Sequence, residues 1–232
     1  MSYTVTKIQD DFWAIDIEMV RCYLFIGDDR AVLVDTMYPG DDLAAQVKQL
    51  TEKPVIVVNT HADPDHIGCN EQFAEIHMHP ADFERYTEFK KDFRCPNPLR
   101  EGEMIDLGNF SFEIVHIPGH TYGSIALLER EKRFILCGDS VQLRPIFMFG
   151  PGRNLTDYIN SLEKLVTMRE SFDTVYTCHG EIKVSPEHIS NLLDAGKRLL
   201  AGELTGVPVA GVSIPLPEGT LTYSTDTVSF IH

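Results

Sequence analysis

Residues 54–66 read Pro-Val-Ile-Val-Val-Asn-Thr-His-Ala-Asp-Pro-Asp-His, an apolar run followed at once by a cluster of polar side chains. The apolar run is typical of a buried strand. The six residues that start at His61 include four potential metal ligands, which are His61, Asp63, Asp65 and His66. Histidine and carboxylate are the ligands that first-row divalent metals prefer. The stretch therefore predicts metal ligands at the end of a buried strand.

The same arrangement of an apolar run and then a ligand recurs three times. Residues 112–117 lead to Pro118-Gly119-His120, residues 134–137 lead to Gly138-Asp139, and residues 174–178 lead to His179-Gly180. The elements expected along the chain are strands, a helix, a strand and a helix, and this order then repeats. Two sheets packed face to face, with helices outside, would bring the strand ends of both halves to one rim. The pattern predicts one shared metal site there.

The composition is that of a soluble globular protein, with 43% hydrophobic and 24% charged residues in 232. We expect a single domain over 1–232, with the Gly-, Pro- and Thr-rich tail 205–232 either adding edge strands or remaining loose. The net charge of −15 argues against a nucleic acid or anionic membrane partner. No basic leader and no membrane-length apolar stretch is visible, and five scattered cysteines without a CxxC pair suit reduced thiols. A cytoplasmic location is expected.

Taken together, the motifs resemble those of the metallo-β-lactamase superfamily over nearly the whole chain. They are Val34-Asp35-Thr36, the HxHxDH-like segment from His61 to His66, Pro118-Gly119-His120-Thr121, Gly138-Asp139 and His179-Gly180. The resemblance implies an α/β (α+β) fold, a four-layer αββα sandwich of two mixed sheets with outer helices.

The resemblance also implies how the ligands are shared between two metal ions. One ion would take His61, position 63 and His120, and the other would take Asp65, His66 and His179. Asp139 would bridge the two ions. Asp35 would support the site from behind, since ligand histidines need oriented partners.

Asp63 departs from the family pattern, which has histidine at this position. Aspartate is shorter and adds a negative charge, and oxygen ligands shift metal preference from zinc toward manganese or iron. The sequence predicts two divalent ions, zinc first, with iron or manganese as alternatives. A single bound ion, with the site at Asp63 weak or empty, is also left open.

Two cations that share a water lower its pKa from about 16 toward 7. The hypothesis is a hydrolase in which metal-bound hydroxide attacks an ester, thioester or lactone carbonyl of a small-molecule substrate. Asp65 would orient the nucleophile and accept its proton as the catalytic residue. This chemistry is similar to that of the glyoxalase II and lactonase branches.

Two other functions are left open. Flavodiiron proteins resemble this chain in having a carboxylate at the position of Asp63, and a persulfide dioxygenase-like iron enzyme is a related redox alternative. Alternatively, Asp63 marks a decayed site in a protein that binds metal without catalysis. True β-lactamase activity is not expected without a leader, and the charge of −15 disfavours the nuclease branches.

The substrate contacts have two interpretations each. Phe147 and Phe149 belong to the apolar segment 141–153, which either forms a lid over the metals or packs against a neighbouring element. Tyr122 either reaches substrate or serves the core. The basic residues Lys90, Lys91, Arg94 and Arg100 either hold an anionic substrate group or form a solvated face. Both a monomer and a homodimer are compatible with the sequence.

Overall fold

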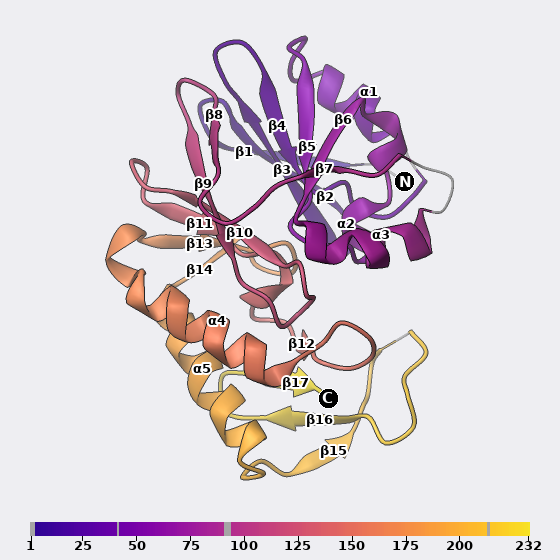
Figure 1. Ribbon diagram of the computed structural model, residues 1–232, viewed down its shortest axis with the longest axis vertical. Helices are drawn as coiled ribbons and strands as arrows, with labels where there is room; N and C mark the ends of the chain where they lie inside the picture. Colours follow the sequence, from indigo (N-terminus) through magenta and orange to yellow (C-terminus); the bar gives the residue numbers. More distant parts are fainter. Residues whose placement is uncertain (1–2, 41, 91–93, 213) are drawn as a thin grey trace.

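A computed structural model describes residues 3–40, 42–90, 94–212 and 214–232, whose strands form three sheets (Figure 1). The first sheet holds, in spatial order, β1 (Thr4–Gln9), β2 (Phe12–Ile17), β3 (Val20–Ile26), β4 (Ala31–Val34), β5 (Val55–Val58), β6 (Glu75–Met78) and β7 (Asn97–Pro98). The second holds β14 (Lys183–Val184), β13 (Thr174–Tyr176), β11 (Phe134–Leu136), β10 (Ile125–Glu129), β9 (Ser111–His116) and β8 (Met104–Asp106). The third holds β12 (Ile146–Phe147), β17 (Ser229–Ile231), β16 (Leu221–Ser224) and β15 (Gly206–Pro208).

Strand β3 shows why the first sheet is buried on both faces. Side chains alternate between the two faces of a strand. Tyr23 and Phe25 enter the core between the two large sheets, where Phe25 meets Phe112 of β9 with ring centroids 4.8 Å apart. Cys22 and Leu24 enter the core on the opposite face. That face is covered by helix α1 (Leu43–Lys48).

The second sheet is covered in the same way by two longer helices, α4 (Leu155–Thr167) and α5 (Glu187–Leu200), which lie side by side (Figure 1). Leu162 of α4 and Leu192 of α5 share a core with Val115 and Ile135 on the outer face of that sheet. The layers therefore run helix, sheet, sheet, helix. The predicted four-layer αββα sandwich is confirmed.

The third sheet was not predicted. Residues of the tail 205–232 form β15, β16 and β17, which join β12 instead of extending an edge of either large sheet. Ile146 pairs in parallel with Phe230, and both side chains are buried in the core under α4 and α5. The physical reason is that these two short segments each supply apolar side chains to the same core.

The strand directions place the candidate ligands at one edge. Strand β4 runs parallel to β5, and β11 runs parallel to β13. Strand β9 is antiparallel to β10, which is antiparallel to β11, so β9 and β11 run the same way. The segments after these strands, which carry the predicted ligands, therefore begin at corresponding edges of the two sheets. In the described ranges, no helix has the length and apolar character needed to span a bilayer.

Candidate metal centre

The seven predicted metal ligands lie together at this rim. His61, Asp63 and His120, which we call the Asp63 half, have one ligand atom each within 4.8 Å of one another. Asp65, His66 and His179, the Asp65 half, form a second such group. That these residues bind metal remains a prediction.

The segment between β5 and helix α2 (Pro64–Ile67) supplies ligands to both halves. Proline suits the first helical position because its missing N–H is not needed there. Asp63 stands at the cap position in an extended conformation, and its carboxylate makes no capping hydrogen bond. Asp65 and His66 follow in the first turn of α2. Neighbouring residues therefore point toward different halves of the centre.

Asp139 lies between the two halves. Its Oδ1 atom is 3.2 Å from Nε2 of His66 and 3.2 Å from Nε2 of His179, and its Oδ2 atom is 3.7 Å from Nε2 of His120. The preceding residue must be glycine, because Gly138 has a φ of +52° and an added Cβ would lie 2.7 Å from Oγ1 of Thr60. One carboxylate thus faces both halves, as the resemblance implies for a bridging ligand.

Asp35 stands behind His66 at the end of β4. Its buried Oδ2 atom lies 2.8 Å from Nδ1 of His66. The same carboxylate accepts hydrogen bonds from the backbone N–H and the hydroxyl of Thr60, both at 2.8 Å. Such a partner fixes the tautomer and the orientation of a ligand histidine. The contact leaves Nε2 of His66 facing the centre.

Two residues of β3 hold the loop that carries His179, and sequence reasoning missed both. The Arg21 guanidinium donates to the carbonyls of Thr177, Gly180 and Glu181 at 3.0–3.3 Å. The Tyr23 hydroxyl donates to the Thr177 carbonyl at 2.7 Å. The first sheet therefore positions a ligand that belongs to the second.

Asp82 links the two ligand loops and was also missed. Its buried carboxylate accepts from the Ala62 N–H at 2.9 Å, the Thr121 hydroxyl at 2.7 Å and the Gly123 N–H at 2.7 Å. Ala62 lies between His61 and Asp63, and Thr121 follows His120. Asp82 therefore fixes the spacing between the two loops of the Asp63 half.

Asp63 is held between two arginines. Nε and Nη2 of Arg85, in helix α3 (Phe83–Phe89), lie 2.8 and 2.7 Å from its Oδ1 atom. Nη2 of Arg153 lies 2.5 Å from Oδ2. The same Oδ2 atom is 3.6 Å from Nε2 of His61 and 3.3 Å from Nε2 of His120. We call this arrangement the Arg85–Asp63–Arg153 clamp.

The charges act in opposite directions on the two halves. Burial opposes ionisation of His66, but Asp139, Asp35 and Asp65 raise its pKa well above the ordinary value. Burial and the Arg153 guanidinium lower the pKa of His120 to about 4. Despite burial, Arg153 and His61 hold the pKa of Asp63 well below its usual range. The Asp63 half is thus the more positive environment for its histidines.

The residues present fit divalent ions. Among the described residues, the buried atoms Nε2 of His61, Nε2 of His120 and Oδ1 of Asp139 have no hydrogen-bond partner. Buried polar atoms are normally paired, so an unpaired group of this kind needs an explanation. Ligand atoms about 2.0–2.1 Å from a tetrahedral zinc ion are separated by roughly 3.3 Å. The distances of 3.2–3.8 Å between ring nitrogens and carboxylate oxygens of the seven candidate ligands match that spacing.

Residues within the predicted lid segment alternate between buried and partly exposed side chains. Ile146 and Met148 are buried in the core under α4 and α5, which supports the packing interpretation for them. Phe147 and Phe149 alternate with them, are partly exposed, and have ring centroids 5.7 Å apart. The Tyr122 side chain is exposed. A substrate role for these three remains a prediction.

Lys90, the first residue of the predicted basic patch, contacts neighbouring protein groups. Lys90 donates to the Gly68 carbonyl and to the Glu71 carboxylate, both at 2.6 Å. Lys91 lies outside the described residues. The contacts of Lys90 favour a structural role over anion binding for that residue.

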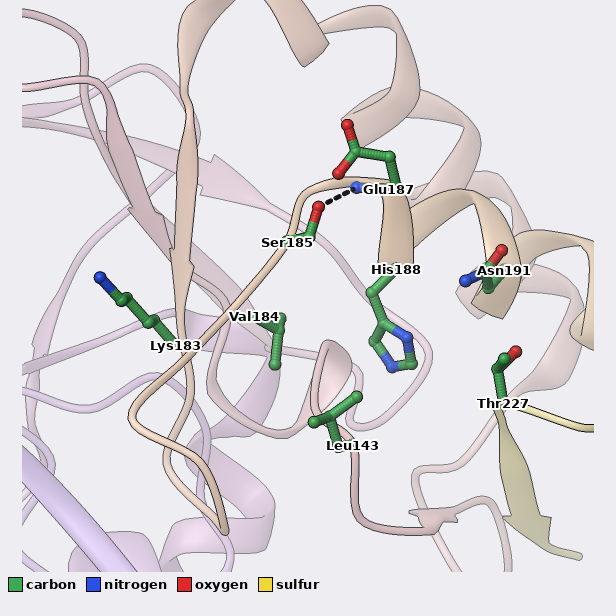
Figure 2. A pocket seen from close by; sticks show the side chains of 8 residues that line it. All are labelled: Leu143, Lys183, Val184, Ser185, Glu187, His188, Asn191 and Thr227. Carbon is green, nitrogen blue, oxygen red and sulfur yellow. Dashed lines mark hydrogen bonds between the residues drawn. The ribbon is translucent and has the colours of Figure 1, made fainter.

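A surface pocket of about 530 Å³ lies elsewhere and contains none of the predicted ligands (Figure 2). Its lining comes from the segment after Asp139, β14, the start of α5 and the tail: Leu143, Lys183, Val184, Ser185, Glu187, His188, Asn191 and Thr227. His188 donates to the Gln142 carbonyl at 2.8 Å. This contact gives His188 a structural role.

Comparison with known proteins agrees with this arrangement. The family model of the metallo-beta-lactamase superfamily matches residues 15–179. The acyl-coenzyme A thioesterase MBLAC2 of Gallus gallus is 28% identical over 144 residues, which cover 50% of this chain and 52% of that protein. The chain thus spans about half the length of that relative. The hydroxyacylglutathione hydrolase GloC of Haemophilus influenzae is 30% identical over 157 residues, which cover 60% of this chain and 71% of that protein.

Solved structures show the same fold. The metallo-beta-lactamase from Pontibacter korlensis superposes with a TM-score of 0.73 at 17% identity, covering 84% of this chain and 99% of that one. At this identity the similarity concerns the fold alone. The family match, by contrast, extends over most of the chain and includes all seven candidate ligands. This protein belongs to the metallo-β-lactamase superfamily.

Proposed function

We propose that this protein is a metal-dependent hydrolase of small-molecule thioesters, with esters and lactones as less favoured substrates. The observation that carries the proposal is the convergence of seven histidine and aspartate side chains at one rim, with unpaired buried nitrogens facing the centre. Divalent cations bound there would supply hydroxide near neutral pH and a positive charge beside the substrate carbonyl.

The roles of the protein side chains follow from their positions. Asp65 lies 3.5 Å from Nε2 of His179 and 3.8 Å from Nε2 of His66, and its side chain is partly exposed. It is therefore placed both to bind a cation and to accept a proton from an attacking water. The two oxygens of Asp139 hold the halves at a fixed separation.

The choice of thioesters rests on two relatives. One is named an acyl-coenzyme A thioesterase and the other a hydroxyacylglutathione hydrolase, and both names describe an acyl group carried on a thiol. Exposed side chains beside the centre suit an acyl chain. The Met19 carbonyl accepts a hydrogen bond from Nδ1 of His179, and the side chain of Met19 is 65% exposed. Tyr38 is 46% exposed, and its partial burial and the nearby Asp65 raise its pKa.

The test begins with elemental analysis of protein purified without added metal. The zinc-loaded protein is then assayed on acyl-coenzyme A and acyl-glutathione thioesters, an aryl ester and a γ-lactone. We expect thioester cleavage, and a loss of at least about 100-fold in Asp139→Asn. Asp194→Asn, a change on the exposed side of α5, should keep full activity.

Two outcomes would contradict the proposal. Zinc-loaded protein that cleaves none of these substrates would exclude this hydrolase activity. Bound iron with visible absorbance and oxygen-dependent chemistry would favour the redox alternative that a carboxylate at position 63 leaves open.

A further inference from the structure

We propose that the Arg85–Asp63–Arg153 clamp makes the two halves of the centre unequal, so that the Asp65 half binds one divalent ion tightly and the Asp63 half binds its ion weakly. This inference rests on the metal binding in the proposed function. It goes further by assigning an order of occupancy, and by assigning its cause to two arginines outside the ligand set.

The first step is the geometry of the clamp. Both oxygens of Asp63 are committed, because Arg85 takes Oδ1 through two nitrogens and Arg153 takes Oδ2 at 2.5 Å. Oδ2 is also the atom that faces His61 and His120. A cation bound by these histidines and Asp63 would therefore share one oxygen with a guanidinium, at about 4 Å from another positive charge.

The second step is the fixed position of the two guanidiniums. The Arg153 side chain is 7% exposed and the Arg85 side chain is 19% exposed. Arg85 also donates to the Pro151 carbonyl at 3.3 Å and lies over the Phe89 ring. Burial weakens solvent screening, and packing keeps the arginines from turning away when a cation arrives.

The third step compares the charges of the two halves, with the histidines neutral and Asp139 shared. The Asp63 half holds one carboxylate and two guanidiniums, which leaves one net positive charge. The Asp65 half holds Asp65 itself and Asp35 behind His66, which leaves two net negative charges. The halves differ by three unit charges in a buried setting. The first divalent ion should therefore occupy the Asp65 half.

The experiment is a zinc titration of the metal-free protein in competition with a chromophoric chelator. Elemental analysis after desalting gives the stoichiometry. We expect one tightly bound ion and a second whose Kd is at least about 100-fold higher, since like charges at about 4 Å repel strongly even at a protein surface. Two ions bound with equal affinity would overturn this inference and leave the proposed function standing. Protein that retains no ion would overturn both.

Variants then identify the cause. Arg153→Met and Arg85→Met remove one guanidinium each, and we expect each to lower the Kd of the second ion about tenfold while the first changes less than threefold. Arg130→Met is the matched control, because Arg130 pairs with Glu113 on an exposed strand end, and it should change neither Kd. If the arginines instead held Asp63 in place as a ligand, the clamp variants would bind the second ion more weakly. That result would overturn the inference.

The melting temperature (Tm) gives a second test of the clamp that does not depend on the zinc titration. Removing Arg153 leaves the buried Asp63 carboxylate with one guanidinium fewer, so the metal-free variant should have a lower Tm than the wild type. A zinc ion beside Asp63 replaces the lost charge. Saturating zinc should therefore raise the Tm of Arg153→Met by more than it raises that of the wild type. An equal or smaller rise would contradict the proposal.

Discussion

The Oδ2 atom of Asp35 lies 2.8 Å from Nδ1 of His66, and both side chains are fully buried. The contact joins the end of β4 to the first turn of α2. Asp35 adopts a left-handed backbone conformation with a φ of +65°, which is uncommon outside glycine and turns its carboxylate toward Thr60 and His66. The position of His66 thus depends on a residue that does not reach the centre itself.

Replacing Asp35 with asparagine should weaken zinc binding in the Asp65 half by about 10–100-fold. The amide keeps the shape of the carboxylate but removes the negative charge behind His66. Chelator competition measures the loss. Asp173→Asn, a change at an exposed ion pair with Arg133, is the control and should leave zinc affinity unchanged. Equal affinity in both variants would show that Asp35 serves the fold alone.

Replacing the buried Asp82 should lower the free energy of unfolding of the metal-free protein. Its carboxylate accepts three hydrogen bonds from two ligand loops, and an amide at this position would set an N–H against one of the donors. Asp82→Asn should lower the free energy of unfolding by about 2–4 kcal/mol, measured by urea denaturation of the metal-free protein. Asp194→Asn, with an exposed carboxylate, should change it by less than about 0.5 kcal/mol. A matching small change in Asp82→Asn would contradict the proposed link.

The convergence of the candidate ligands could be predicted from sequence because each ligand segment begins within a few residues of the end of a strand. A buried strand is visible as an apolar run, and the loop that follows it begins at the edge of the sheet. The order of the motifs along the chain indicated the remaining candidate ligands. His120, Asp139 and His179 are far apart along the chain, yet the repeated pattern placed all three at one rim.

The clamp could not be predicted in the same way. Arg85 and Arg153 lie 22 and 90 residues from Asp63, and neither belongs to a motif. An arginine in a surface helix or a glycine-rich loop is ordinarily solvated, so composition gives no sign of its partner. Arg21 could not be predicted for another reason. The apolar pattern of its strand indicates that the strand is buried, but not that the guanidinium donates to carbonyls of the loop that carries His179.

The third sheet was missed for a related reason. Strand β12 has two residues and β15 has three, which is too short for the alternation that marks a strand. The pairing of β12 with β17 depends on a core shared by segments about 80 residues apart along the chain, which local patterns do not report. The apolar segment 141–153 was interpreted as one unit, although the pairing of β12 sends alternate side chains in opposite directions.

His120 should make the metal-free protein lose stability in acid. Its pKa of about 4 lies below the usual value of 6.5, so between these pH values the unfolded chain takes up a proton that the folded protein excludes. Stability therefore falls as pH falls from 6.5. The raised pKa of His66 acts in the opposite direction, so the test is a comparison with His120→Gln. Between pH 6.5 and 5, the wild type should lose about 1.5 kcal/mol more than the variant in urea unfolding. Parallel losses would exclude this role.

Arg21 should control the ligand loop of His179 from the opposite sheet. Its guanidinium donates to three carbonyls of residues 177–181 and pairs with Asp16 at 2.6 Å, so Arg21→Met frees four acceptors at once. We expect zinc affinity of the Asp65 half to fall at least about tenfold, because a ligand on a looser loop must be ordered when the ion binds. Arg21→Lys keeps the positive charge but not the planar set of donors. Its zinc affinity should lie between those of the wild type and Arg21→Met.

A general loss of folding would also weaken zinc binding, so the measurement needs a second readout. The hydrogen bond from Nδ1 of His179 to the Met19 carbonyl reports the loop position directly. In Arg21→Met the NMR signal of that ring N–H should broaden or disappear, while the Nδ1 signal of His66, held by Asp35, should persist. If both signals persist and zinc affinity is unchanged, the loop is positioned by β13 and β14 alone. If both Nδ1 signals disappear, Arg21 stabilises the fold as a whole and not the His179 loop in particular.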